Sequence, residues 1–506
     1  MQQACIFPQY LIVTCIMAEN PPWMQTRISE RDPLMERWSS HIGFILAAIG
    51  AAVGLGNIWR FSSVLGQNGG GAYLIPYFIA VFVVVLPLMI LEIAMGRRLR
   101  GTAVSSFSAV RPEFRIIGWL VCAVSFVILG YYLVITGWTI AYLLFSITGE
   151  TVPFSGFTGS YQPVIFAMVA AIITSVIVSA GIRKGIERLA LILIPACIVI
   201  LVIMALYSIT LPGFQQAMRY LFTPDFSVLT HADIWLAAFG QALFSLSVGE
   251  GILLTYGAYM EQEQDIRKAA IVITLADFCV ALLAGLVIFP VVFSNGLSPA
   301  AGSELAFTTL PLAFATLPAG RFLAIAFFAV LFFAAITSAV SMLEVCVAAV
   351  DEATGWTRRK TTMILTAILF PAVLLPALSY SPMHLSLAGT ALLDILDETV
   401  GTIGLHVVAI LLAITFTWFV PPAIFLEELG ADSLLNRYIF ALCKYLIPVA
   451  LFLTVVTELV TGTDFSGITF IRGAQHISSI FRVEGVVLFA FLVLIACLIL
   501  GRPRGE

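Results

Sequence analysis

The sequence predicts an all-α polytopic membrane protein of twelve transmembrane helices, arranged as two inverted five-helix repeats with discontinuous helices 1 and 6. Composition indicates the class, because 60% of the 506 residues are hydrophobic and 11% are charged, whereas soluble domains hold roughly 25% charged residues. Two apolar segments are interrupted at mid-membrane, which indicates the repeats. The uncharged runs that exceed the ~20 residues needed to span hydrocarbon are 116–149, 162–182, 189–218 and 322–343.

The apolar segments divide into twelve spans. Their expected ranges are 40–67, 72–97, 116–148, 162–182, 187–209, 233–259, 267–296, 320–350, 360–379, 389–420, 437–461 and 482–501. Residues 302–319 are expected to form a helical hairpin in an outside loop.

The basic residues predict the orientation of these spans. Of 25 Lys and Arg residues, 20 fall on the side of the N-terminus, and Arg60 lies within the membrane. Loops rich in Lys and Arg remain cytoplasmic. The protein is therefore expected in the cell inner (plasma) membrane, with both termini on the cytoplasmic side. The absence of any Asn-x-Ser/Thr sequence suits a bacterial inner membrane. The four basic residues expected outside are Arg219, Arg321, Arg472 and Arg482.

The chain is expected to divide into four segments. Eight cysteines are scattered, mostly inside apolar spans, so neither a disulfide framework nor a metal site is indicated. The net charge of −4 gives no indication of nucleic acid. The segments are a flexible or misassigned N-terminal leader at 1–34, a first five-helix repeat at 35–209, a second, inverted repeat at 210–427, and peripheral helices 11 and 12 at 428–506.

The first interruption lies in the first span. Glycines at 50, 54 and 56 occur in the middle of an otherwise apolar helix, and Asn57 and Arg60 follow. Glycine is a poor helix former and lets bare backbone approach a ligand. Irregular backbone at membrane depth persists only where protein buries it or where it lines a cavity, so Asn57 and Arg60 are candidate site residues. Close packing through small residues explains the glycines but not Arg60.

The second interruption lies in the sixth span, at 240–251, where small and polar residues again replace apolar ones. Each half has five spans, and because five is an odd number the two halves have opposite orientations in the membrane. The first span of each half is the interrupted one. A pair of Gly-interrupted segments at corresponding positions indicates the binding site of a transporter.

Several motifs resemble those of the neurotransmitter:sodium symporter family, the family of bacterial leucine-transporter-like, sodium-coupled amino acid transporters. These motifs are GFILAA at 43–48, NIWRF at 57–61, NGGGAY at 68–73, GIER at 185–188 and FAAITS at 333–338. The similarity runs from about residue 38 to residue 500. It implies two inverted five-helix repeats plus two peripheral helices.

The resemblance also implies two sodium sites. Sodium is a hard cation that takes oxygen ligands, and broken helices free carbonyl groups that an intact helix would use. For Thr337 and Ser338, the alternative is back-bonding to a carbonyl one turn earlier. Site 1 is expected to use the carbonyl of Ala52, the side chains of Asn57, Ser245 and Asp277, and the substrate carboxylate. Site 2 is expected to use the carbonyls of Gly50, Val53 and Ala334 and the hydroxyls of Thr337 and Ser338.

The substrate is expected to be an amino acid. The outer half of the first helix begins at Gly54–Gly56, so its free N–H groups and positive dipole end suit a carboxylate. Monoamine-transporting relatives hold Asp at the position of Gly54, so a glycine indicates an α-amino acid. By resemblance, Tyr132 donates to the carboxylate, and the ammonium faces carbonyl groups near Ala51. The expected substrate-binding residues are Ala52, Gly54, Gly56, Ile128, Tyr132, Phe244, Ser245, Ser247, Glu250, Ser338 and Met342.

Two positions depart from the family pattern. Many relatives hold Asn at the position of Asp277, and a nearby chloride supplies the charge; here Ala281 stands at the chloride-ligand position, which predicts chloride-independent transport. Asp277 is also a candidate for proton uptake once sodium leaves. Glu250 replaces the usual Phe or Met, and a buried carboxylate is costly unless it is paired or protonated. Glu250 faces a basic or strongly polar substrate side chain, carries a proton, or is neutralised by a protein partner; our hypothesis is the first.

Gates are expected on both sides of the site. By resemblance, Arg60 pairs with Asp397 across the entry path, and Tyr132 and Phe244 form an aromatic lid. On the inside, relatives place an Arg three residues before Trp38, where this chain has Met35. Arg37 or Arg31 must then substitute, with Glu352 or Asp351 as the acid.

The sequence thus predicts a sodium-coupled symporter that imports an amino acid by alternating access, in the lipid bilayer, as a monomer or homodimer. Three alternatives are an amino-acid sensor, a channel, and a sodium-coupled transporter of another organic solute. A sensor is expected to carry a long soluble tail, and a channel to have a continuous polar pore. An enzyme is not indicated, because no nucleophile–base pair or metal cluster occurs within the spans and the five histidines are dispersed.

Overall fold

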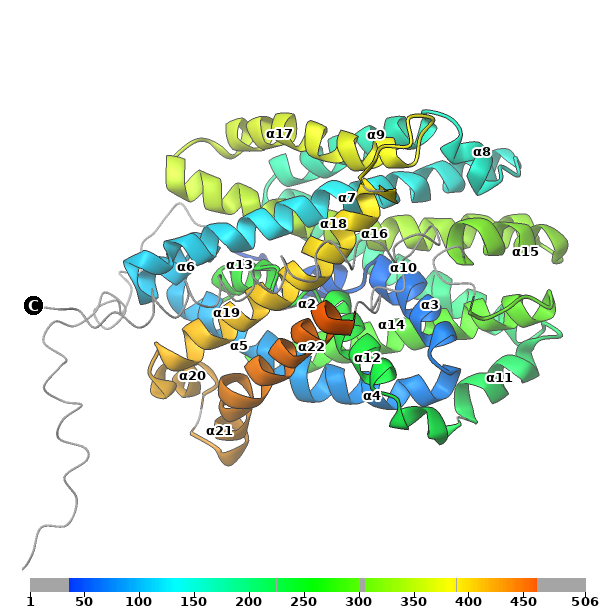
Figure 1. The fold of residues 1–506 in the computed structure, drawn as a ribbon. Coiled ribbons are helices and arrows are strands. Elements are labelled where there is room, and N and C mark those ends of the chain that lie inside the picture. The colour runs from blue at the N-terminus through cyan, green and yellow to red at the C-terminus, as the bar shows by residue number, and fades with distance from the viewer. Residues whose placement is uncertain (1–35, 224, 301–304, 388, 431, 462–506) are drawn as a thin grey trace, which may run out of the picture.

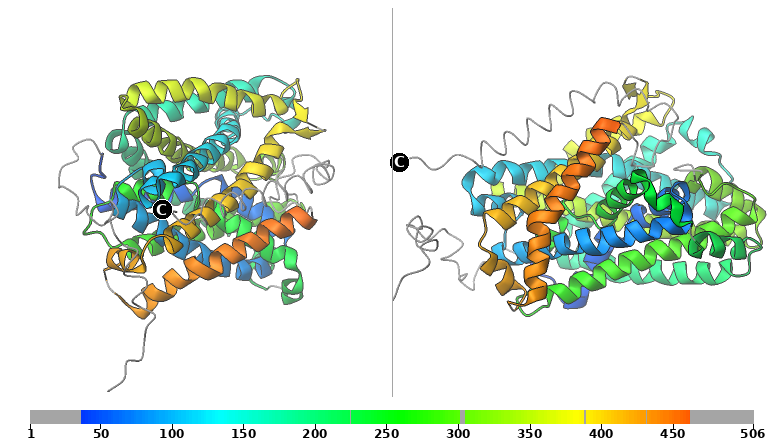
Figure 2. Two further views of the ribbon diagram at one scale, coloured as in Figure 1. Left: turned by 60° about the vertical axis from the view of Figure 1, so that its left-hand side comes forward. Right: turned by 60° about the horizontal axis from the view of Figure 1, so that its bottom comes forward.

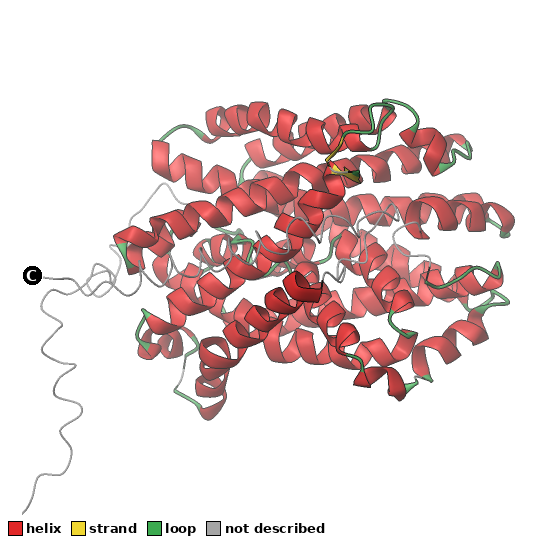
Figure 3. Ribbon diagram, in the orientation of Figure 1, coloured by secondary structure: helices red, strands yellow, loops and turns green. Residues whose placement is uncertain are grey.

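The computed structural model describes residues 36–223, 225–300, 305–387, 389–430 and 432–461, and most of these residues are helical (Figure 3). The predicted leader at 1–34 and the predicted twelfth span at 482–501 lie outside the described residues. The one sheet within the described ranges is a short antiparallel pair, in which Ser386 is opposite Ala391.

The first five spans occupy the first half of the chain, and short 3-10 and π segments are labelled η. The elements are α2 (His41–Ala52), η1 (Gly56–Arg60), α3 (Phe61–Gln67), η2 (Gly70–Tyr73), α4 (Leu74–Ile79), η3 (Ala80–Val85), α5 (Leu86–Leu99), α6 (Ala103–Val110), η4 (Pro112–Phe114), α7 (Arg115–Thr148), α8 (Phe154–Thr158), α9 (Gln162–Ser179), η5 (Ile182–Glu187) and α10 (Arg188–Ser208).

The remaining described elements follow from residue 214 to residue 461. The elements are α11 (Phe214–Phe222), η6 (Phe226–Thr230), α12 (Ala232–Ser245), α13 (Ile252–Ala258), α14 (Ile266–Ser294), η7 (Leu305–Thr309), α15 (Leu310–Thr316), α16 (Gly320–Thr354), α17 (Arg358–Ser379), β1 (Ser386–Leu387), β2 (Thr390–Ala391), α18 (Leu392–Leu396), η8 (Asp397–Gly404), α19 (Leu405–Trp418), α20 (Pro422–Glu428), α21 (Leu434–Ala441), η9 (Leu442–Leu446) and α22 (Ile447–Thr461).

The described residues contain nine continuous apolar helices long enough to cross a membrane, and the bent pair His41–Ala52 and Gly56–Gln67 is a tenth candidate span, with a bend of 51°. The predicted sixth span is divided into α12 and α13, which are separated by residues 246–251, so the predicted interruption at 240–251 begins later than expected. The predicted outside hairpin at 302–319 is only partly described, and residues 305–316 form a single helix.

The breaks are built from residues that tolerate unusual backbone angles. Between α12 and α13, Gly249 and Gly251 have φ of 95° and 76°, a region that glycine enters at no steric cost. Ser247 also has a positive φ of 50°, which costs a residue with a side chain roughly 1–2 kcal/mol. Its Oγ donates to the carbonyl oxygen of Ala51 at 3.1 Å, which joins the second break to the first.

The broken helices lie inside the bundle. In Figure 1 most long helices run along one direction, and α2 lies among α10, α13, α14 and α16, against which it packs. Helix α22 packs against α19 on one face (Figure 2). Helix α10 lies at the outside, where Ile192, Val199 and Ile203 are exposed. Exposed apolar side chains of this kind suit contact with lipid.

A buried ion pair joins α5 to α20 at the expected cytoplasmic side. Arg97 Nε lies 2.8 Å from Glu428 Oε2, and both side chains are 4% exposed. The same guanidinium donates to the carbonyl oxygen of Gln264. Removal of one partner of such a pair leaves a buried charge without compensation.

We expect Arg97→Ala to destabilise the protein by about 3–5 kcal/mol, measured as a lower thermal midpoint in detergent. The matched control is Arg437→Ala, which removes an ion pair with Asp432 whose side chains are 64% and 51% exposed. This control should leave the midpoint nearly unchanged, because exposed pairs contribute little. Equal midpoints for both variants would contradict a stabilising role of the buried pair.

Candidate functional site

The break at residues 53–55 turns backbone groups of the first span toward side chains. The N–H of Gly54 donates to Asn57 Oδ1 at 3.0 Å. The N–H of Leu55 donates to Tyr132 Oη on α7 at 3.2 Å. Val53 is extended, with φ −75° and ψ 92°, so its carbonyl turns out of the helix. The predicted interruption is confirmed.

Three predicted ligands of sodium site 1 meet at one point. Asn57 Nδ2 lies 2.8 Å from Ser245 Oγ and 2.5 Å from Asp277 Oδ1. Ser245 Oγ lies 3.1 Å from both carboxylate oxygens of Asp277. The three residues come from η1, α12 and α14 and are at most 1% exposed. Ala52, the fourth predicted ligand, is the last residue of α2 and is buried.

The predicted site 2 lies where α16 passes α2. Ser338 Oγ lies 3.3 Å from the carbonyl oxygen of Gly50, 3.1 Å from that of Ala51 and 3.2 Å from that of Ala334. Carbonyl groups of two helices therefore converge on one hydroxyl. Such an arrangement suits a hard cation.

Thr337 behaves differently from Ser338. Its Oγ1 lies 3.0 Å from the carbonyl oxygens of both Phe333 and Ala334, so these two bonds stay within α16. These contacts of Thr337 are the alternative named above, in which a hydroxyl binds a carbonyl oxygen one turn earlier in its own helix. Its Cβ nevertheless lies 3.2 Å from the position of a Cβ built on Gly50, so the side chain borders the same place.

Gly54 exposes bare backbone to two hydroxyl groups. A Cβ at Gly54 would lie 2.8 Å from Ser338 Oγ and 2.9 Å from Tyr132 Oη, both shorter than ordinary contact. Any side chain at this position would therefore displace one of the two hydroxyls.

The other predicted substrate-binding residues surround this backbone. Phe244 Cδ1 lies 3.1 Å from the position of a Cβ at Gly56. Ile128 and Met342, on α7 and α16, are buried, and so are Ser247 and Glu250 in the second break.

The predicted outer gate residues also come together. The Arg60 guanidinium lies 4.3 Å from the centre of the Phe244 ring. Arg60 and Asp397 interact electrostatically and are only 2% and 4% exposed. A Cβ at Gly401 would overlap Tyr131 Oη and lie 3.1 Å from Asp397 Oδ1, which places Tyr131 beside Asp397.

The predicted inner pairs are not the ones that form among the described residues. Arg31 lies outside these residues, and Arg37 takes part in none of the ion pairs found in the described ranges. Instead, Arg358 pairs with the buried Glu344, to which Tyr259 Oη also donates at 3.0 Å. Arg37 thus does not form the expected pair in this structure, and the alternative with Arg31 stays a prediction. Of the two acids expected there, Glu352 accepts from Thr102 Oγ1.

Two residues beside the breaks were not predicted from the sequence. Gln241 Nε2 donates to the carbonyl oxygen of Gly56 at 2.8 Å, which links α12 to the first break. Glu92 on α5 is fully buried and accepts from the N–H of Gly249 at 2.6 Å. A signal was present for Glu92, because it is the one acid within the apolar run 72–97 and such residues are functional by default.

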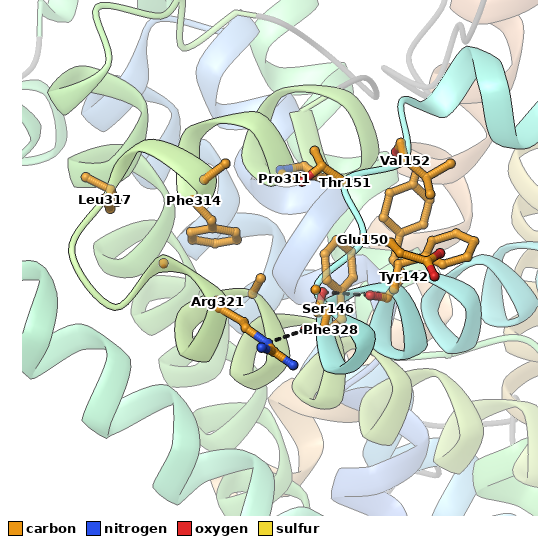
Figure 4. Close-up of a pocket in the computed structure, with 15 residues that line it drawn as sticks. Tyr142, Ser146, Glu150, Thr151, Val152, Pro311, Phe314, Leu317, Arg321 and Phe328 are labelled. Carbon is orange, nitrogen blue, oxygen red and sulfur yellow. Dashed lines mark hydrogen bonds between the residues drawn. The ribbon is translucent and has the colours of Figure 1, made fainter.

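Two cavities open near loops that the sequence predicts to lie outside, apart from the predicted site residues. One of about 200 Å³ lies between α7, α15 and α16, and Glu150 and Arg321 line it with Phe314 (Figure 4). The Arg321 guanidinium donates to the carbonyl oxygens of Ser146 and Ile147, so it caps the end of α7. The other, of about 320 Å³, lies beside α8. No predicted site residue lines either cavity.

Comparison with known proteins gives consistent matches. The model of the Sodium:neurotransmitter symporter family matches residues 35–163 and 156–499. An uncharacterized sodium-dependent transporter of Bacillus subtilis is 33% identical over 444 residues, which cover 84% of this chain and 97% of that protein. An uncharacterized sodium-dependent transporter of Methanocaldococcus jannaschii is 35% identical, over 76% of this chain and 82% of that protein.

A solved structure shares the fold. The crystal structure of MhsT in complex with L-phenylalanine has a TM-score of 0.78 and 36% sequence identity, and the match covers 83% of this chain and all of that one. The sodium-dependent neutral amino acid transporter B(0)AT3 of Rattus norvegicus is 30% identical, over 52% of this chain and 50% of that protein.

Proposed function

Because the chain belongs to the sodium:neurotransmitter symporter family and is a sodium-dependent transporter of the membrane, we propose that it imports an α-amino acid together with sodium by alternating access. The observation that carries this proposal is the meeting of Asn57, Ser245 and Asp277 beside the open backbone at Gly54. Oxygen ligands for sodium and backbone N–H groups for a substrate carboxylate then lie within one buried site.

Two sodium ions are proposed as coupling ions. At site 1, Asp277 supplies a negative charge, and Asn57 has to turn its amide over so that Oδ1, rather than Nδ2, faces the ion. At site 2, the carbonyl groups of Gly50 and Ala334 converge with the hydroxyl of Ser338. Two sodium ions that move down 100 mV and a tenfold gradient supply roughly 7 kcal/mol to concentrate a solute.

The substrate carboxylate is proposed to bind where the second half of the first span begins. The N–H of Leu55 points to this region and Tyr132 Oη lies beside it, and the N-terminal end of a helix favours an anion. The names of two similar proteins support an amino acid, since one is a neutral amino acid transporter and one was solved with L-phenylalanine.

The gates suit alternating access. Arg60 and Phe244 cover the site on one side, and Trp38, Tyr259 and Glu344 pack on the other, where Trp38 Nε1 donates to the carbonyl of Tyr256 at 3.1 Å. Sodium and substrate must bind one conformation better than the other for coupling to arise. We propose that the termini face the cytoplasm and that repeats 35–209 and 210–427 move relative to one another.

The function is tested by uptake of the twenty amino acids into proteoliposomes, with sodium outside or with choline in its place. We expect saturable accumulation of at least one amino acid against its gradient, and only with sodium. Sodium-driven uptake of a solute without a carboxylate would favour the organic-solute alternative. Sodium-dependent binding without uptake would favour a sensor.

Chloride is expected to have no effect. Asp277 brings a fixed negative charge to site 1, and Ala281, one turn later on α14, offers no group that binds an anion. Replacement of chloride by gluconate should therefore leave the initial rate of uptake within about twofold. A rate that collapses in gluconate and returns with chloride would refute the prediction.

A further inference from the structure

Two carboxylates lie together at the break between α12 and α13. Glu92 of α5 and Glu250 of the break are 0% and 1% exposed. The N–H of Gly249, the residue before Glu250, donates to Glu92 Oε1 at 2.6 Å. The two acids also interact electrostatically. They form one acidic pair, although 158 positions of sequence separate them.

The acidic pair has no cationic partner among the described side chains. None of the ion pairs in the described ranges includes Glu92 or Glu250. The Oε2 atoms of both residues are buried without a hydrogen-bond partner there. Two basic residues of neighbouring helices are already engaged, Arg97 with Glu428 and Arg358 with Glu344.

Such an arrangement is unstable by itself. An unpaired charge at membrane depth is costly, and two neighbouring carboxylates do not both stay ionised without a cation. One shared proton would leave one negative charge, which matches one cationic group. A side chain kept only as a neutral acid would need an acceptor for its O–H group, and the Oε2 atoms of Glu92 and Glu250 have no hydrogen-bond partner among the described residues.

The acidic pair lies on the side of the proposed substrate site. Glu250 interacts electrostatically with Tyr131 and Tyr132. Tyr132 Oη is also the group that meets the N–H of Leu55, where the α-carboxylate is proposed to bind. The break that holds Glu250 is joined to the first break by the hydrogen bond from Ser247 Oγ to the carbonyl oxygen of Ala51 at 3.1 Å. Glu250 and the proposed carboxylate site at Leu55 therefore belong to two breaks that meet at Ala51, and we place the substrate side chain toward Glu250.

Resting on the proposed function, we propose that the transported amino acid carries a cationic side chain, an ammonium or a guanidinium, which is neutralised by Glu250 with Glu92 behind it. Glu250 is then the residue that determines specificity. Glu92 acts through Glu250 and the backbone of Gly249, as a positioning residue.

The test compares lysine with norleucine, which has the same carbon chain without the ammonium. Proteoliposomes with the full chain take up each radiolabelled compound under a sodium gradient. We expect the wild type to prefer lysine by about 100-fold or more in transport efficiency, the scale expected for a buried charge pair. Arginine should compete with lysine, and leucine should not.

Two variants of Glu250 and one of Glu92 assign the preference for lysine to these acids. Glu250→Met should lose lysine uptake and take up norleucine, with sodium dependence unchanged. Glu250→Gln should reduce the preference for lysine at least about tenfold. Glu92→Gln should lower lysine affinity without a gain of norleucine. The matched control is Glu150→Gln, an acid of the exposed outer loop, which should match the wild type.

The outcomes separate this inference from the proposed function. Sodium-driven uptake of norleucine or leucine in preference to lysine overturns the cationic substrate and leaves amino acid symport standing. The cationic substrate is also overturned if uptake of a neutral amino acid is accompanied by proton movement and Glu250→Gln abolishes that proton movement. Glu250 is then a proton carrier. Uptake of no amino acid at all removes the proposed function itself. If both Glu250 variants fail to fold, the preference of the wild type still decides.

Discussion

Replacement of Asp277 by Asn should abolish sodium-driven uptake and weaken sodium binding by at least about 100-fold, or about 3 kcal/mol. Asp277 is the carboxylate that contacts both Asn57 and Ser245 within the described residues. An uncharged amide of the same size keeps the packing but removes the anionic oxygen that a hard cation favours. The effect is large because the cluster is fully buried, where water cannot replace the lost ligand.

The measurement is the sodium dependence of substrate binding and of uptake, with the thermal midpoint as a check of folding. Asp265→Asn is the matched control on the same helix. Asp265 caps α14 by accepting from the N–H groups of Arg267 and Lys268, and Asn caps helices about as well as Asp. A folded Asp277→Asn protein with unchanged sodium dependence would exclude Asp277 as a sodium ligand.

Replacement of Gly54 by Ala should lower transport efficiency by about 10- to 100-fold, the effect of roughly 1–3 kcal/mol of overpacking. The new methyl group would lie 2.8 Å from Ser338 Oγ and 2.9 Å from Tyr132 Oη. One hydroxyl belongs to the proposed sodium site 2 and the other to the proposed carboxylate site. A single methyl group therefore disturbs both ion and substrate binding.

Gly240→Ala is the control for this prediction. Gly240 lies on the other broken span, in α12, and a Cβ there meets nothing within 4 Å. Alanine is a better helix former than glycine by up to about 1 kcal/mol, so this variant should be as active as the wild type and no less stable. Equal initial rates for the two variants would show that the space at Gly54 is not needed.

The predicted breaks illustrate what local sequence determines. Gly50, Gly54 and Gly56 indicated an interruption because helix propensity is a property of short segments. The charged or polar residues that follow, Asn57 and Arg60, indicated a site because lipid tolerates neither. The structure confirms the first break, and the second is present at 246–251.

The inner pair illustrates what local sequence leaves open. Arg37 was chosen by its place relative to Trp38, with Glu352 or Asp351 as the acid, yet the described residues pair Arg358 with Glu344. Many acids and bases lie near the ends of the spans on the side of the N-terminus. Which of them meet depends on how far each helix extends and where the next one begins.

The acid at Glu92 is a similar case. Its partner is a backbone N–H, 157 positions away at Gly249, and a peptide group leaves no mark in a sequence. Its neighbour Glu250 was recognised as unusual, but the existence of an acidic pair followed only from the fold.

By itself, the sequence determined the membrane class, the spans, the two interruptions and the residues with oxygen atoms suited to sodium, because hydrophobicity and helix breaking are local. The tertiary structure decided which of these groups meet: Asn57 with Ser245 and Asp277, Arg358 with Glu344, and Glu92 with the N–H of Gly249. The physical reason is that buried polar groups must find partners, and the partner is chosen by the packing of distant helices.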